Sequence, residues 1–174
     1  MRIVHSRRRL PRIWSNHPEA RGLVVAETDI AITNGPLRAK LLVFRNRTAL
    51  RQFWEKALNK SGHGEKLSLR CEGAVNSLMH KHRKVNADGS EKTWIEVDPR
   101  YFCIIGLVKG MSEFASAMEI VAHESMHAGF AYAKRVNRDG FWVKASGMDE
   151  EDVCYPAGRI ARKINLFLAK RGLY

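Results

Sequence analysis

Residues 114–133 read FASAMEIVAHESMHAGFAYA, and they contain the run His123-Glu124-Ser125-Met126-His127. Residues four apart lie one above the other on the same face of an α-helix, so both imidazoles can reach one metal ion. Glu124 lies about 100° around the helix from His123, beside the position of a metal-bound water. The spacing therefore predicts a zinc site on a helix, with His123 and His127 as ligands.

The surroundings of the motif strengthen this prediction. Between Phe114 and Ala133 the only charged residues are Glu119 and Glu124. One side of the expected helix repeats at spacings of four and three, through Phe114, Met118, Val121, Ser125, Ala128 and Tyr132. Such a helix is expected to be buried on most of its circumference, where polar groups need partners. Zinc and its water account for the three polar residues together; the alternative is two core histidines and a glutamate on one helix.

Length and composition indicate a single domain over residues 1–174, with a basic N-terminal arm at about residues 1–20. An apolar fraction of 45% excludes a disordered chain, and no apolar run is long enough to span a membrane. The start of the chain does not resemble a secretory signal. Three scattered cysteines favour reduced thiols and a cytoplasmic location.

The formal net charge of +12 is concentrated at the two ends of the chain. Residues 1–12 hold five arginines and no acid, and the five cations after Asp152 also have no acid among them. Such ends favour a nucleic acid, an acidic protein surface or anionic lipid as partner. The alternative is a solvated surface that keeps a small protein soluble.

The pattern of the remaining chain predicts an α+β fold, with a small, mostly antiparallel sheet packed against a central HExxH helix and a C-terminal helix. Asn34-Gly35 indicates a hairpin turn, Thr48 an N-cap, and Asp98-Pro99 a strand end. Residues 67–108 are expected to be mostly extended, with a turn at residues 86–90. The expected strands are residues 23–33, 37–44, 94–97 and 101–108. The other two expected helices are residues 48–58 and a C-terminal helix that begins at the acidic residues 149–152 and ends at about residue 171.

A catalytic zinc usually has three protein ligands and an open position for water. No histidine follows His127, which excludes the HExxHxxGxxH arrangement. A carboxylate from the cluster Asp149-Glu150-Glu151-Asp152 is the leading candidate, although acids at a helix start also suit the helix dipole. Glu150 lies in line with the apolar stripe of the last helix. Glu151 shares its face with small residues, which would let that face approach the motif helix closely.

The HExxH motif, followed some two dozen residues later by a helix that bears glutamate, resembles the gluzincin group of zinc metallopeptidases. In particular, His123-Glu124-x-x-His127 with Glu151-x-x-Cys154-Tyr155 resembles small phage- and prophage-encoded members, over about residues 110–170. Cys154 stands where alanine is usual, and Pro156 within the helix is a further departure. The resemblance implies a minimal zincin-like fold in a host cytoplasm, Zn²⁺ as cofactor and Glu151 as third ligand.

The expected activity is hydrolysis of a peptide bond in a protein or peptide substrate by a zinc-activated water, with Glu124 as proton acceptor. Tyr155 is a candidate oxyanion donor, and the alternative for it is a buried structural tyrosine. The extended segment at residues 94–108 is expected to offer an edge strand to the substrate. Rival interpretations are a nucleic-acid-associated factor, a protein-interaction module with a structural zinc, and a regulatory protease that combines both features.

Overall fold

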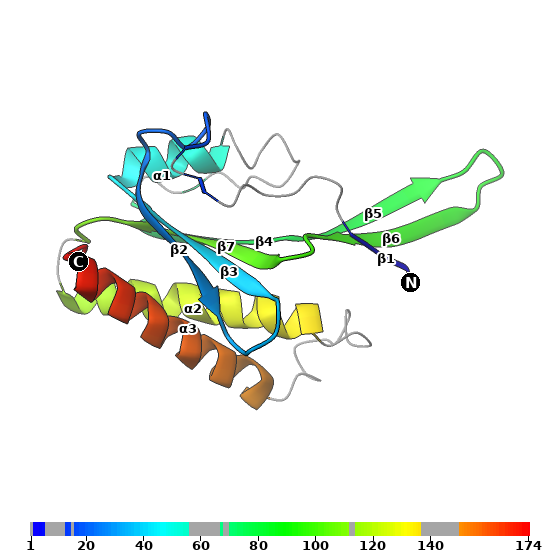
Figure 1. Cartoon of the computed structure of the whole chain (residues 1–174). Helices are drawn as coiled ribbons and strands as arrows, with labels where there is room; N and C mark the ends of the chain where they lie inside the picture. The colour runs from blue at the N-terminus through cyan, green and yellow to red at the C-terminus, as the bar shows by residue number, and fades with distance from the viewer. Residues whose placement is uncertain are drawn as a thin grey trace.

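The computed structural model describes residues 2–5, 13–14, 16–55, 67, 70–111, 114–136 and 150–174. Among these residues it forms an α+β structure with two small mixed sheets and three helices (Figure 1). In chain order the elements are β1 (Arg2–His5), β2 (Val24–Ala31), β3 (Arg38–Phe44), α1 (Arg47–Phe53), β4 (Gly73–Ser77), β5 (Met79–Val85), β6 (Glu91–Val97), β7 (Tyr101–Val108), α2 (Phe114–Val136) and α3 (Glu150–Arg171).

The larger sheet holds four strands in the order β2-β3-β7-β4. β2 and β3 are antiparallel and are joined by a short connection that contains Asn34-Gly35, as the sequence predicts. β7 runs parallel to β3 and antiparallel to β4, and its continuous apolar sequence is buried throughout, as is typical of an inner strand. The prediction of an edge strand within residues 94–108 is therefore wrong for this sheet, whose outer strands among the described residues are β2 and β4.

The second sheet has the order β1-β6-β5. β5 and β6 form an antiparallel hairpin around the turn expected at residues 86–90, and this hairpin extends away from the rest of the molecule in Figure 1. β1 pairs in parallel with β6, with Arg2 opposite Trp94. The prediction of a loosely structured arm at residues 1–20 is therefore wrong where the chain is described, because β1 is a strand and Trp14 is buried. Both sheets mix parallel and antiparallel pairs, whereas the sequence predicts a mostly antiparallel sheet.

Asp98-Pro99 separates β6 from β7 and so divides the two sheets. Pro99 has no N–H to donate to a strand ladder. The Oδ1 atom of Asp98 accepts hydrogen bonds from the backbone N–H groups of Arg100 at 2.8 Å and Tyr101 at 2.7 Å. On the other strand Leu78 separates β4 from β5, and its N–H donates to the carbonyl of Phe102 at 2.9 Å. The bend leaves β4 in the larger sheet, where it packs against α2.

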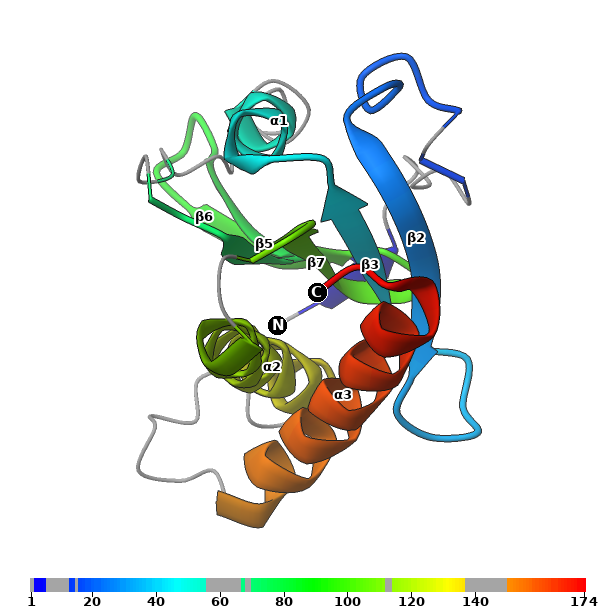
Figure 2. The same cartoon turned by 90° about the vertical axis from the view of Figure 1, so that its left-hand side faces the viewer.

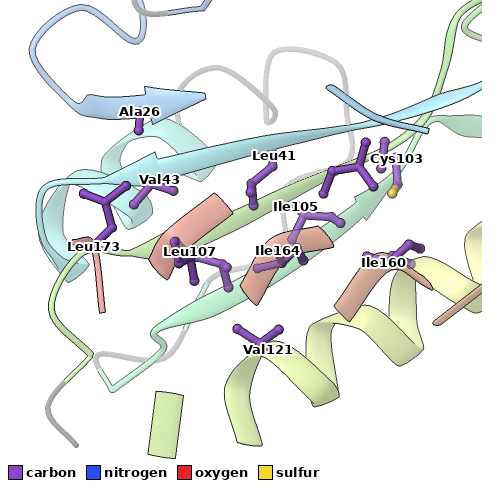
Figure 3. Close-up of a cluster of buried hydrophobic side chains, with 14 of the residues drawn as sticks. Ala26, Leu41, Val43, Cys103, Ile105, Leu107, Val121, Ile160, Ile164 and Leu173 are labelled. Carbon is purple, nitrogen blue, oxygen red and sulfur yellow. The ribbon is translucent and has the colours of Figure 1, made fainter. Parts of the chain in front are cut away.

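The helices cover both faces of the larger sheet. α2 and α3 run antiparallel to each other on one face, and α1 lies on the other (Figures 1 and 2). The main core fills the space between the sheet and α2 and α3, where Leu41 and Ile105 face Val121 and Ile164 (Figure 3). The apolar stripe predicted for α3 is confirmed, with Val153, Ala157, Ile160, Ile164 and Leu168 buried and Phe167 partly buried.

The cap of α1 lies two residues before the one that the sequence indicates. The N-cap is Asn46, not Thr48, and its side chain accepts a hydrogen bond from the N–H of Ala49 at 2.8 Å. Both residues are suitable caps, so the choice depends on where the chain leaves β3. The described helix ends at Phe53, and the predicted end at residue 58 lies outside the described residues.

α2 is less buried than its composition suggests. Val121, Ser125 and Ala128 face the core, but Met118 and Phe130 are exposed, so the prediction of burial on most of the circumference is wrong. The helix is covered on two sides, by the sheet and by α3. Among the described residues, no helix has the length and apolarity needed to cross a membrane.

Candidate metal centre

The two motif histidines lie side by side on the exposed face of α2. Their Nε2 atoms are 3.0 Å apart, with ring centroids at 4.6 Å and planes inclined by 80°. Two nitrogens that bind one tetrahedral zinc at about 2.0–2.1 Å lie about 3.3 Å apart. The rings therefore already point their ligand atoms at one position, as the i, i+4 spacing predicts.

The electrostatics of the pair suit a cation. Partial burial and the neighbouring His123 both lower the pKa of His127 below its ordinary value of 6.5. A neutral imidazole presents a lone pair, and this is the form that binds metal. At neutral pH His127 is therefore ready to act as a ligand, without first having to lose a proton.

Glu124 points from the same helix toward β4 and is buried, as the sequence predicts, with an exposed fraction of 6%. It packs over the backbone of Gly73: a methyl group at that residue would lie 2.6 Å from Cγ and 2.9 Å from Oε1 of Glu124. Burial raises the pKa of Glu124 from 4.5 to about 7. A carboxyl group with this pKa can take up and release a proton near neutral pH.

A groove of about 320 Å³ opens between α2 and the start of β4. Cys71 lies at this groove with its thiol donating a hydrogen bond to the carbonyl of Gly73 at 2.7 Å, and burial raises the pKa of that thiol. Glu124 and His123 therefore share a solvent-accessible recess with a neutral thiol. The lining residues are Arg70, Cys71, Glu72, Gly73, Glu119, Ile120, His123 and Glu124.

The remaining predicted ligand is not brought to the histidines. Glu151 is exposed in the first turn of α3. Within the described ranges, no three histidine, cysteine or acidic side chains are grouped closely enough to hold a metal ion. Asp149, another member of the acidic cluster, lies outside those ranges. The structure thus places His123 beside His127 and, at the groove, beside Glu124, and the third ligand remains a prediction.

The packing of α3 on α2 explains this separation. Gly129 provides the close contact, since a methyl group there would lie 2.8 Å from the carbonyl of Val153 and 3.0 Å from Cβ of Ala157. Gly129 is two residues from His127 and therefore about 200° away around the helix. α3 consequently packs on the flank of α2 that faces away from the histidines.

The face of α3 that approaches α2 is also not the one that its small residues indicate. A methyl group added at Gly158 would have no neighbouring atom within 4 Å, and Cys154 is exposed. The contact runs instead through Val153 and Ala157, in line with Glu150. Tyr155 is 65% exposed, so the alternative of a buried structural tyrosine is wrong. Its role as an oxyanion donor remains a prediction.

Sequence reasoning missed the contribution of Gly73 and its neighbours. These residues fall in a segment whose pattern indicates only extended structure, and their approach to Glu124 depends on how the sheet is assembled. One signal was present, because a glycine within a strand often marks a site where another group comes close to the backbone. Gly73 has that function here, since any larger residue would displace the Glu124 side chain.

Comparison with models of protein families, with curated proteins and with solved structures gives no match for this chain.

Proposed function

We propose that this protein is a zinc-dependent metallopeptidase whose catalytic base is Glu124. The observation that carries the proposal is the arrangement on α2: two Nε2 atoms 3.0 Å apart, next to a buried carboxyl group with a pKa of about 7. His123 and His127 would hold the metal, and Glu151, with Glu150 as the alternative, stays the predicted third ligand although the start of α3 does not lie beside the histidines in this structure. When bound, zinc supplies a Lewis acid that polarises a carbonyl group and makes water more acidic.

The role of Glu124 follows from its surroundings. Its carboxylate would accept the proton of the attacking water and return it to the leaving amine. Gly73 lies against the Glu124 side chain, and both residues line the groove together with His123. The groove admits a substrate from solvent.

β4 is the strand best suited to bind an extended peptide. Among the described strands it pairs only with β7, so its other edge is available for a backbone ladder. Its first residue, Gly73, contacts Glu124, which would bring a peptide paired with β4 close to the catalytic groups. This assigns to β4 the substrate-pairing role that the sequence suggests for residues 94–108.

The first test is the zinc content of protein purified without added metal. Wild type and the control His5→Ala, which removes an exposed histidine of β1, should each carry about one zinc per chain, and His123→Ala should lose it. Comparing Glu151→Ala with Glu150→Ala then identifies the third ligand. No zinc in the wild type, even after reconstitution, would refute the proposal.

The second test concerns catalysis. Wild type and Glu124→Gln, both loaded with zinc, are incubated with a mixture of peptides of diverse sequence, and the new termini are identified by mass spectrometry. Cleavage by the wild type should fall by about 10²-fold or more in the variant. Equal cleavage by both proteins, or zinc binding with no cleavage of any peptide or protein offered, would assign the metal a structural role.

A further inference from the structure

The outward face of α3 is a row of exposed cations. Arg159, Arg162, Lys163 and Lys170 are all exposed, and no acidic residue follows Asp152 in the sequence. At about 100° per residue, these four side chains fall within about 100° of the helix circumference. Along the axis they extend over about 16 Å, at about 1.5 Å per residue. The opposite face of the helix holds its apolar stripe.

These cations are not neutralised by acids. In the part of the chain that the structure describes, none of the four takes part in an ion pair. Arg159 donates a hydrogen bond to the carbonyl of Ile32 at 3.2 Å, and Lys163 donates to that of Ala31. Carbonyl oxygens position a cation but leave its net charge in place. The row therefore keeps its full positive charge.

The neighbouring strand adds no negative charge to this face. On β2 the acids are Glu27 and Asp29, and both bind Lys40, with the Asp29 contact at 2.8 Å. Their side chains lie on the opposite face of the sheet from Ile30, which packs toward α3 in the main core.

Two simpler explanations do not account for the row. The helix dipole favours cations in the last turn, which explains Lys170 but not Arg159 or Arg162. An amphipathic helix binds a membrane by inserting its apolar face, but that face of α3 is buried in the core. Of the large hydrophobic side chains of α3, two exposed ones would remain to enter a bilayer, Leu166 at 50% and Tyr155 at 65%.

We propose that the outward face of α3 binds the phosphate backbone of a nucleic-acid duplex without regard to sequence. Arginine and lysine along a rigid helix match a line of phosphates, which follow one another at about 3.4 Å per strand along the duplex axis. α3 packs on the flank of α2 turned away from His123 and His127, so a bound duplex leaves the groove open. The proposed duplex site does not use His123, His127 or Glu124.

The test measures binding of a fluorescein-labelled DNA duplex of about 30 base pairs by anisotropy, over a range of salt concentrations. The variant is Arg162→Gln/Lys170→Gln, because neither side chain bonds to the backbone and folding should be unaffected, as a thermal melt by circular dichroism will check. The matched control is Lys84→Gln/Lys92→Gln, which removes two exposed charges from the β5–β6 hairpin. Both variants have the same net charge.

We expect the α3 variant to bind at least about fivefold more weakly at about 0.1 M salt, with the slope of log Kd against log salt reduced by about 1–2. The control should stay within about twofold of the wild type. Equal weakening in the two variants would show that binding follows net charge and not this face, and would overturn the proposal. So would absence of duplex binding at low salt, or preference for phosphatidylserine vesicles over the duplex.

Discussion

Replacing Glu124 by glutamine should stabilise the metal-free protein at neutral pH. The carboxyl group is 6% exposed, and burial raises its pKa from 4.5 to about 7. Folding therefore favours the protonated form, and an ionised Glu124 costs free energy. Glutamine has the same shape and carries no charge at any pH, so it avoids this cost.

The pH window and the magnitude follow from linkage. Between pH 4.5 and about 7 the folded protein keeps a proton on Glu124 that the unfolded chain has lost, so the stability of the wild type falls as the pH rises. At about 1.36 kcal/mol per pH unit, the loss amounts to about 3 kcal/mol, reached at about pH 7 and constant above it. Below pH 4.5 both states are protonated, and Glu124 contributes no pH dependence.

The assay is urea unfolding of wild type and Glu124→Gln in the presence of a chelator, at half-unit steps from about pH 4 to about pH 8. Subtracting the two free energies of unfolding cancels every other titrating group, since the chains differ at one position. The difference should be constant below about pH 4.5, grow in favour of the variant, and level off at about 3 kcal/mol above about pH 7. A difference that is flat across this range, or that favours the wild type as the pH rises, would refute the burial of an uncompensated carboxyl group.

Two further predictions concern the elements that frame the site. Gly129→Ala should be less stable than Gly158→Ala by about 1–3 kcal/mol in urea unfolding, because both gain helix propensity but only the first drives a methyl group into the carbonyl of Val153. Similar stabilities would mean that α2 and α3 do not meet at Gly129. Asn46→Ala should cost about 1 kcal/mol by loss of the N-cap of α1, whereas Thr48→Ala should cost little. A larger loss of stability for Thr48→Ala than for Asn46→Ala would show that Thr48 is the cap.

The parts of the fold that the sequence predicts well are those with a strong local period. The apolar run of β7 and the stripe of α3 each specify one element, and the stripe also specifies the buried side of its helix. The order of strands carries no such signal. That β1 pairs with β6 and β3 with β7 depends on contacts between distant segments, and a parallel pair has no tight turn that could indicate it.

The candidate site, too, has a part that local sequence patterns predict and a part that depends on how distant segments pack. The i, i+4 spacing is a property of the helix itself, so the approach of His123 to His127 follows from the sequence. Glu150 and Glu151, two of the three acidic residues in the first turn of α3, are both candidates for the third ligand in the sequence, and choosing between them requires the rotation of α3 about its own axis. That rotation is set at Gly129 by the contact with Ala157, which no pattern in the chain reports.

Three features of the centre are poor choices for stability alone, and this favours a function for them. A helix side packed against a strand would be more stable with alanine or leucine in place of Glu124, whose burial disfavours its charge at neutral pH. Adjacent exposed rings at His123 and His127 add little to packing, and a glycine within β4 weakens the strand. Each departure is local, but Glu124, His123 and Gly73 line one groove. Places where several local rules are broken together are expected at functional sites, and the proposed metal with a water beside Glu124 would be a single cause for all of them.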